Sequence, residues 1–178
     1  ASDVYKRQDL ERVWTARRPG AYHLEYGFSC MGYEVSGALG VKLADPEHEV
    51  YTFVGDGGFL MGHSDLLTSI QEGHKINVLL FNNSGHQCIH NLERSQGMDT
   101  FGTEFRFREQ STGGLTGSYV PVNYSELASA YGAKTWRVTT LAELHAAIEA
   151  SKQADVSTLI EIMVLPGTMT EGYENFWR

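Results

Sequence analysis

The chain has 178 residues, of which 42% are hydrophobic and 20% charged, a balance that predicts one globular domain rather than a disordered segment. Its formal net charge of −8 argues against nucleic acid and anionic membranes as partners. No apolar stretch approaches the roughly 20 residues of a membrane span. We therefore expect a cytoplasmic protein with a small-molecule ligand, and two reduced cysteines, Cys30 and Cys88.

The N-terminal region differs from the rest of the chain. Residues 1–8 are polar and without periodicity, and the sequence opens with Ala1 rather than Met. We interpret residues 1–21 as an N-terminal remnant or linker. Residues 22–178 are then expected to form one domain, a fragment of a longer protein.

Beyond residue 21 strand and helix patterns alternate. Four short apolar runs bounded by turn residues predict buried strands, and residues spaced three or four apart predict helices between them. The helices expected near 124–131 and 141–151 each open with a cap residue followed three positions later by Glu. The expected strands are 50–54, 76–81, 134–138 and 159–165, and the expected helices are 32–44, 64–72, 124–131 and 141–151.

This alternation predicts an α/β fold, a parallel sheet flanked by helices on both faces. In such folds ligands bind beyond the carboxyl ends of the strands. The stretch 84–122 lacks clear periodicity, and for residues 111–118 the sequence leaves two interpretations open, a disordered excursion or a cover over the active site.

Polar clusters follow two of the expected strands. The run 50–54 leads into Gly55-Asp56-Gly57-Gly58, and the run 76–81 leads into Asn82-Asn83-Ser84-Gly85. Carboxylate and amide oxygens suit Mg²⁺, and glycines allow backbone N–H groups to approach a diphosphate. Either cluster alone is more simply a strand-ending turn, but both lie at the edge of the sheet where a ligand is expected.

Taken together, the two clusters resemble the signature of the thiamine-diphosphate enzymes, Gly-Asp-Gly followed by Asn-Asn, with Asn83 here 27 positions (83 − 56) after Asp56. The resemblance implies the diphosphate-binding domain of that family, with thiamine diphosphate and Mg²⁺ as cofactors. It implies Mg²⁺ ligation by Asp56, Asn83 and the carbonyl of Gly85. It also implies that the turn 55–58, through the amides of Gly57 and Gly58, contacts the diphosphate.

A second match lies upstream, in Gly27-Phe-Ser-Cys-Met-Gly32. In decarboxylase-like members of the family the corresponding segment holds the aminopyrimidine. The resemblance therefore makes Ser29, Cys30 and Met31 cofactor-binding residues, with Met31 as the apolar wedge that bends the cofactor. Without the downstream signature, Met31 would be read as an ordinary core methionine.

Longer strings between Tyr22 and Trp177 resemble the trihydroxycyclohexane-1,2-dione hydrolases of myo-inositol catabolism. Examples are Tyr22–Glu34, Lys75–Phe81 and Thr168–Tyr173. The resemblance implies cofactor-dependent nucleophilic catalysis that cleaves a ring C–C bond and releases 5-deoxyglucuronate. It also implies a homo-oligomer, because the activating Glu belongs to a pyrimidine-binding domain, commonly of a neighbouring subunit. No segment here matches that domain, so we expect this chain alone to be inactive.

Two histidines depart from the pattern of those hydrolases. His86 and His90 stand where Phe and Asn are expected, and we interpret them as candidate substrate-side residues. Their i, i+4 spacing would also suit a second metal on a helix, an interpretation that the missing acidic residue between them disfavours.

Two other functions stay open from the sequence. One is a different thiamine-diphosphate enzyme, such as an acetolactate synthase or a 2-oxoacid decarboxylase, which segment 86–118 would distinguish. The other is a non-catalytic phosphate-binding regulatory domain, in which Asp56 and Asn83 only cap turns.

Overall fold

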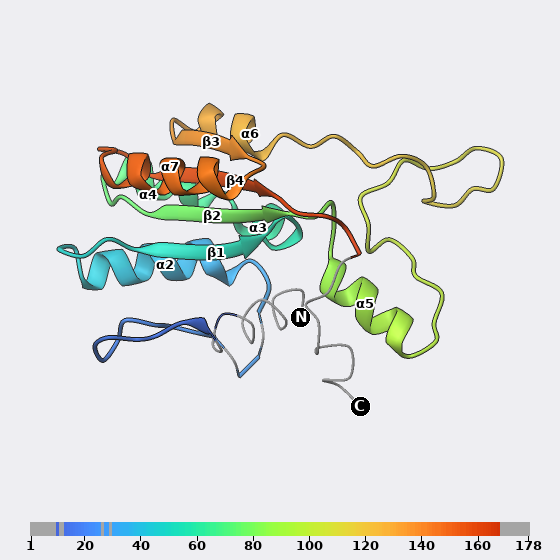
Figure 1. The fold of residues 1–178 in the computed structure, drawn as a ribbon, viewed down its shortest axis with the longest axis horizontal. Helices are drawn as coiled ribbons and strands as arrows, with labels where there is room; N and C mark the ends of the chain where they lie inside the picture. Colours follow the sequence, from blue (N-terminus) through green and yellow to red (C-terminus); the bar gives the residue numbers. More distant parts are fainter. Residues whose placement is uncertain (1–9, 11–12, 26, 29, 168–178) are drawn as a thin grey trace.

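A computed structural model describes residues 10, 13–25, 27–28 and 30–167. Strands and helices alternate along this part of the chain (Figure 1). Their bounds are α2 Tyr33–Ala44, β1 Tyr51–Gly55, α3 Asp56–Gly62, α4 Asp65–Gln71, β2 Asn77–Asn82, α5 Gln87–Ser95, α6 Tyr124–Ala130, β3 Lys134–Val138, α7 Leu141–Lys152 and β4 Thr158–Met163.

The four strands form one parallel sheet in the order β1-β2-β4-β3. All strands therefore end at the same edge, and Gly55 at the end of β1 lies opposite Phe81 of β2. The expected fold class, a parallel α/β sheet, is confirmed. Each of the four expected strands is present within two residues of its expected ends, with β4 ending at Met163 rather than 165.

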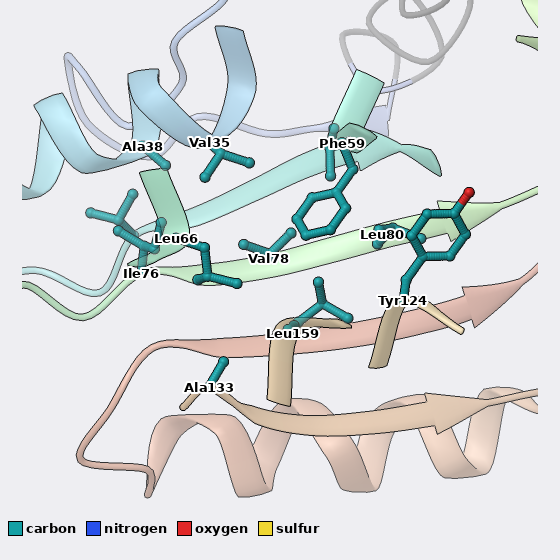
Figure 2. Close-up of a cluster of buried hydrophobic side chains, with 13 residues drawn as sticks. Val35, Ala38, Phe59, Leu66, Ile76, Val78, Leu80, Tyr124, Ala133 and Leu159 are labelled. Carbon is teal, nitrogen blue, oxygen red and sulfur yellow. The ribbon is translucent and has the colours of Figure 1, made fainter. Parts of the chain in front are cut away.

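Helices cover both faces of the sheet, because the central strands alternate buried apolar side chains between the two sides. On one face Val78, Leu80 and Leu159 pack against α2, α3, α4 and α6 (Figure 2). On the other face Leu79 and Ile160 pack against α7. Within the described residues, no helix has the length and apolar character needed to span a bilayer.

Helix α7 begins with the capping box that its sequence predicts. The Thr140 hydroxyl accepts from the backbone N–H of Glu143, and the Glu143 carboxylate accepts from the N–H of Thr140. At α6 the side chain of Asn123 accepts from the N–H of Glu126. These caps satisfy N–H groups that a helix start otherwise leaves unpaired.

Two helices lie where the sequence predicted none. Helix α3 begins at Asp56, directly after β1, and α5 occupies residues 87–95 of the stretch that lacked periodicity. Helix α5 and the loop after it lie beyond the carboxyl ends of the strands (Figure 1). Residues 111–118 belong to an excursion that folds back on itself, with hydrogen bonds from Phe107 N to Ser118 O and from Gly117 N to Phe107 O.

The loop that follows α5 is fastened to the end of β2. Phe105 N donates to Ser84 O over 2.9 Å, and His86 N donates to Thr103 O over 2.7 Å. Between these two bonds, the Glu104 carboxylate accepts hydrogen bonds from Arg106, Tyr119 and Gln87 at 2.8, 2.7 and 3.2 Å. Burial alone would raise the pKa of Glu104, but these donors outweigh it and lower the pKa to about 2.

The N-terminal region is only partly described. Trp14 lies against Tyr22 and Phe53, with ring centroids 6.4 and 6.5 Å apart. The assignment of residues 1–21 to a remnant or linker stays a prediction. Cys30 is exposed and Cys88 buried, and the structure records no disulfide between them.

The Glu104 cluster yields a prediction about pH. We expect Glu104→Gln to lower the free energy of unfolding at pH 7 by about 1–3 kcal/mol, because the groups that donate to the Glu104 carboxylate lose a charged acceptor. A carboxyl group with a lowered native pKa stabilises the fold above its ordinary pKa of 4.5 and loses that effect as pH falls toward 2. Denaturant unfolding should therefore show a smaller difference in unfolding free energy between Glu104→Gln and the original protein at pH 3 than at pH 7.

Glu109→Gln is the matched control, since Glu109 lies in the same loop and is exposed. Equal destabilisation by Glu104→Gln at both pH values would show that the charge of Glu104 does not hold the loop.

Candidate functional site

Asp56 lies at the centre of the site, at the junction of β1 and α3. Its side chain is fully buried, with 0% exposure. One carboxylate oxygen accepts from Gly57 N over 3.0 Å and the other accepts from Gly85 N over 2.9 Å. The second bond ties the end of β1 to the turn that follows β2, so the two sequence clusters meet as predicted.

Asn83 lies against the same group of oxygens. With its amide nitrogen turned inward, the side chain donates to Gly85 O over 3.0 Å and to Asp56 Oδ1 over 3.1 Å. With its amide oxygen turned inward, three oxygen atoms from Asp56, Asn83 and Gly85 would face one another. Three facing oxygens repel unless a cation lies among them, and oxygen ligands are those that Mg²⁺ prefers. The donor set therefore fits a hard divalent cation.

The turn that carries Asn83 and Gly85 has an uncommon backbone. Ser84 has a φ of 60°, and among the described residues it is the one non-glycine residue with positive φ. Gly85 has a φ of 152°, and a Cβ atom there would overlap the carbonyl oxygen of Thr103. Glycine is needed at 85 because the 103–105 segment packs directly on it.

Gly57 and Gly58 are buried in the first turn of α3. A Cβ atom on Gly57 would overlap the imidazole of His86, which also packs edge-on against Phe105 at a centroid distance of 5.5 Å. Gly57 thus lets the turn after β2 approach the start of α3 closely. The same lack of a side chain leaves its backbone accessible at close range.

Gly32, the last residue of the upstream match, lies against the far end of α3. A Cβ atom on Gly32 would come within 3.0 Å of Met61 Cβ, and one on Gly62 would overlap Gly32 O. Met61 is five residues along α3 from Asp56, roughly 7–8 Å at 1.5 Å per residue. Met31 is half-buried and Cys30 exposed, and Ser29 lies outside the described residues.

The two histidines have different surroundings. His86 precedes the first residue of α5 and lies beside Gly57. His90 is buried in α5, with its Nδ1 3.2 Å from Thr103 Oγ1. The described residues contain no group of three His, Cys, Asp or Glu side chains arranged to hold a metal, so nothing here supports a second metal at this pair.

Several residues around the site had been given no role from the sequence. Asn82 and Glu161 are buried and hydrogen-bonded to each other. Tyr124 is also buried, and its hydroxyl points toward the carboxyl ends of the strands (Figure 2). Burial, then the charges of Asp56 and Glu161, raises the pKa of Tyr124 well above its ordinary value, so the hydroxyl stays neutral. A charged residue inside the apolar run 159–163 was the available signal for Glu161.

Comparisons with known proteins agree with this geometry. Residues 7–162 match the family model of the thiamine pyrophosphate enzyme C-terminal TPP binding domain. The chain is 56% identical over 170 residues to 3D-(3,5/4)-trihydroxycyclohexane-1,2-dione hydrolase 2 of a Bacillus cereus strain and to the hydrolase of Bacillus thuringiensis (strain Al Hakam). Each match covers 96% of this chain and 26% of the relative, so the chain spans about a quarter of their length.

A solved structure is similar in fold. It is the thiamine diphosphate-dependent 4-hydroxybenzoylformate decarboxylase of Rhodococcus jostii RHA1, with a TM-score of 0.65 and 22% sequence identity, covering 76% of this chain and 23% of that one. Because the family model matches most of its length, and the strand-end cluster agrees with it, this chain belongs to the C-terminal TPP-binding domains of the thiamine pyrophosphate enzymes.

Proposed function

We propose that this chain is the Mg²⁺- and diphosphate-binding domain of a longer, cytoplasmic enzyme that opens trihydroxycyclohexane-1,2-dione to 5-deoxyglucuronate. The observation that carries the proposal is the convergence of Asp56, Asn83 and Gly85 O at the edge of the sheet. The 56% identity to the two Bacillus hydrolases supports the substrate assignment.

In this proposal Mg²⁺ is held by the Asp56 carboxylate, the Asn83 amide oxygen and the Gly85 carbonyl. Asn83 turns its amide oxygen inward when the cation is present. The bond from Gly85 N to Asp56 Oδ2 leaves Oδ1 as the metal-facing oxygen, because Oδ1 is the atom near Asn83. Binding at Oδ1 would compete with the Gly57 N–H bond to the same atom, so that amide becomes available to a diphosphate oxygen.

The turn 55–58 then receives the diphosphate, with Gly57 and Gly58 permitting close approach of their amides. Ser29, Cys30 and Met31 hold the aminopyrimidine, and His86 and His90 belong to the substrate side of the site. Thiamine diphosphate supplies a nucleophilic carbon and an electron sink for cleavage of the C–C bond. The residues of this chain bind and orient the cofactor.

The proposed enzyme is at least a homodimer. Its activating Glu is expected in a pyrimidine-binding domain outside this chain, contributed by the same enzyme or by a neighbouring subunit. The relatives are about four times as long as the part matched here, which supports further domains.

The metal assignment is tested by cofactor binding in the full-length protein. We expect thiamine diphosphate to bind only with Mg²⁺ present, and Asp56→Ala and Asn83→Ala each to weaken that binding at least about tenfold, as loss of metal-supporting groups does. Calorimetric titration at several Mg²⁺ concentrations measures this, with Asp99→Ala, an exposed carboxylate, as control. Unchanged binding in both variants would favour a regulatory phosphate-binding domain instead.

Gly57 allows a test of whether the diphosphate approaches the backbone amides at the start of α3. Gly57→Ala should destabilise the protein by about 1–3 kcal/mol, because its methyl group overlaps His86. Adding His86→Ala should restore the melting temperature and with it the affinity for thiamine diphosphate, because the methyl group then lies in the space that the imidazole has left. Gly40→Ala in α2, where an added Cβ atom would point into open space, is the control and should stabilise by up to about 1 kcal/mol. An affinity for thiamine diphosphate that Gly57→Ala alone leaves unchanged would contradict diphosphate binding at Gly57.

The substrate is tested by turnover. With thiamine diphosphate and Mg²⁺, the full-length protein should open the cyclic dione and leave pyruvate unchanged, whereas the 178-residue chain alone should do neither. The products can be followed by NMR. Pyruvate consumption without ring opening would keep the cofactor site and assign the protein to the acetolactate synthases or 2-oxoacid decarboxylases.

A further inference from the structure

A buried pair of polar side chains lies directly behind the proposed metal turn. Asn82 is the last residue of β2 and is 5% exposed. Its Nδ2 donates to Glu161 Oε1 over 2.7 Å, and its Oδ1 accepts from Ser84 N over 3.2 Å. Asn82 therefore connects the neighbouring strand β4 to the turn that carries Asn83 and Gly85.

Glu161 is held in one orientation by contacts on both of its oxygens. It is 0% exposed. Its Oε2 accepts from Ser125 N over 3.1 Å and from Ser125 Oγ over 2.9 Å, while Arg137 Nε lies 3.7 Å from Oε1. A buried carboxylate is tolerated only with such partners. Glu161 thereby fixes Asn82 relative to both β4 and the first turn of α6.

The Asn83–Gly85 turn needs this support because of its backbone conformation. A non-glycine residue with positive φ, such as Ser84, persists only where its surroundings enforce it. One enforcing contact is the bond from Ser84 N to Asn82, and another is the bond from Phe105 N to Ser84 O. Because the next residue, Gly85, contributes both a carbonyl and the N–H bound to Asp56, a shift at Ser84 displaces two parts of the site.

We infer that Asn82 and Glu161 are positioning residues that set the conformation of the Asn83–Gly85 turn and, through it, the affinity for Mg²⁺. The inference rests on the proposed metal site. It assigns a function to the first asparagine of the Asn82-Asn83 pair and to a glutamate 79 residues away. Partners behind metal ligands commonly change metal affinity about 10- to 100-fold when they are altered.

The test exchanges donor and acceptor between the two positions. Asn82→Asp keeps an acceptor for Ser84 N but turns a second carboxylate toward Glu161. In Glu161→Gln one of the two carboxylate oxygens becomes an NH₂ group. That group then faces a donor, which is the Asn82 amide in one orientation and the Ser125 N–H and hydroxyl in the other. In the double variant the new amide at 161 donates to the new carboxylate at 82, and its oxygen still accepts from Ser125. Each single change is therefore unfavourable, and the pair restores every hydrogen bond.

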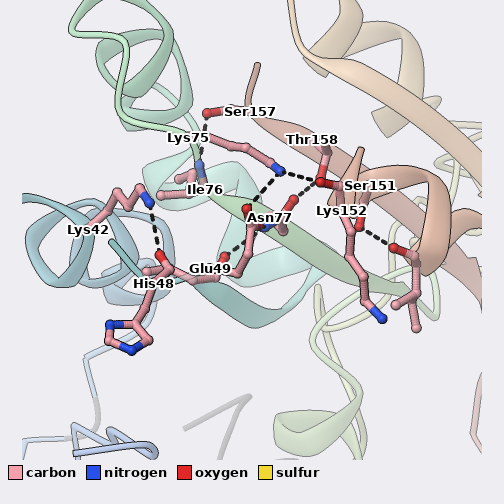
Figure 3. Close-up of polar contacts among 12 residues, drawn as sticks. Lys42, His48, Glu49, Lys75, Ile76, Asn77, Ser151, Lys152, Ser157 and Thr158 are labelled. Atoms are coloured by element: carbon pink, nitrogen blue, oxygen red, sulfur yellow. Dashed lines mark hydrogen bonds and ion pairs between the residues drawn. The ribbon is translucent and has the colours of Figure 1, made fainter. Parts of the chain in front are cut away.

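The matched control lies at the opposite end of the same strand. Asn77 is also buried, with its Nδ2 2.7 Å from Glu49 and its Oδ1 accepting from Thr158 (Figure 3). Asn77→Asp likewise sets two carboxylates against each other, but at the amino end of the sheet. It should lower the melting temperature without changing the response to Mg²⁺.

Two measurements on the full-length protein decide the outcome. The first is the Mg²⁺ concentration for half-maximal binding of thiamine diphosphate, expected to rise about 10- to 100-fold in each single variant and to return toward the original value in the double variant. The second is hydrogen exchange of the peptide covering residues 82–87 without metal, expected to be faster in the single variants and restored in the double.

The results separate this inference from the metal assignment. Single variants that fold and leave both readouts unchanged, or a double variant as impaired as the single ones, would overturn the positioning role. In a third outcome, hydrogen exchange follows the expected pattern but cofactor binding does not depend on Mg²⁺. That result would support the role of Asn82 and Glu161 in holding the turn, and it would overturn both the metal site and the link to Mg²⁺ affinity.

Discussion

The hydrogen bond from Gly85 N to the buried Asp56 carboxylate joins the two halves of the site. It exists because β1 and β2 are adjacent parallel strands in a register that places Gly55 opposite Phe81. Burying a carboxylate is unfavourable unless donors satisfy it, and the amides of Gly57 and Gly85 do so. A slip of one residue in this register would reverse which side chains face the core, so core packing and site geometry are set by the same alignment.

The arrangement of the sheet follows from patterns visible in the sequence. Apolar runs predicted all four strands, and helical spacing or capping signals predicted α2, α4, α6 and α7. Helices α3 and α5 gave no comparable signal. Helix α3 opens with Asp-Gly-Gly, which disfavours a helix locally, and it is held instead by burial of Phe59. Helix α5 buries Gln87, Cys88 and His90 rather than aliphatic residues, so the sequence shows no helical spacing of apolar residues there.

The site was predictable only in part. Asp56 and Asn83 could be brought together from the sequence because both follow strands that end at one edge of the sheet. The contact of Asn82 with Glu161 could not, because the apolar pattern does not tell that β2 and β4 are neighbours in the sheet. The contacts of Glu104 with Arg106 and Tyr119 could not either, because they lie in a stretch without periodicity. His86 and His90 looked alike in the sequence, yet one lies beside Gly57 and the other is enclosed by α5 and Thr103.

The contact between Gly32 and Gly62 has an evolutionary consequence. The backbone of one residue occupies the space where the other would carry a Cβ atom, and Gly32 also has a φ of 85°. A side chain at either position therefore requires the two segments to separate. The overlap at 62 is with a carbonyl oxygen that any residue at 32 would carry, and the constraint at 32 is its own positive φ. Each glycine should therefore be retained independently among diverging homologues, although the two meet across 30 residues (62 − 32).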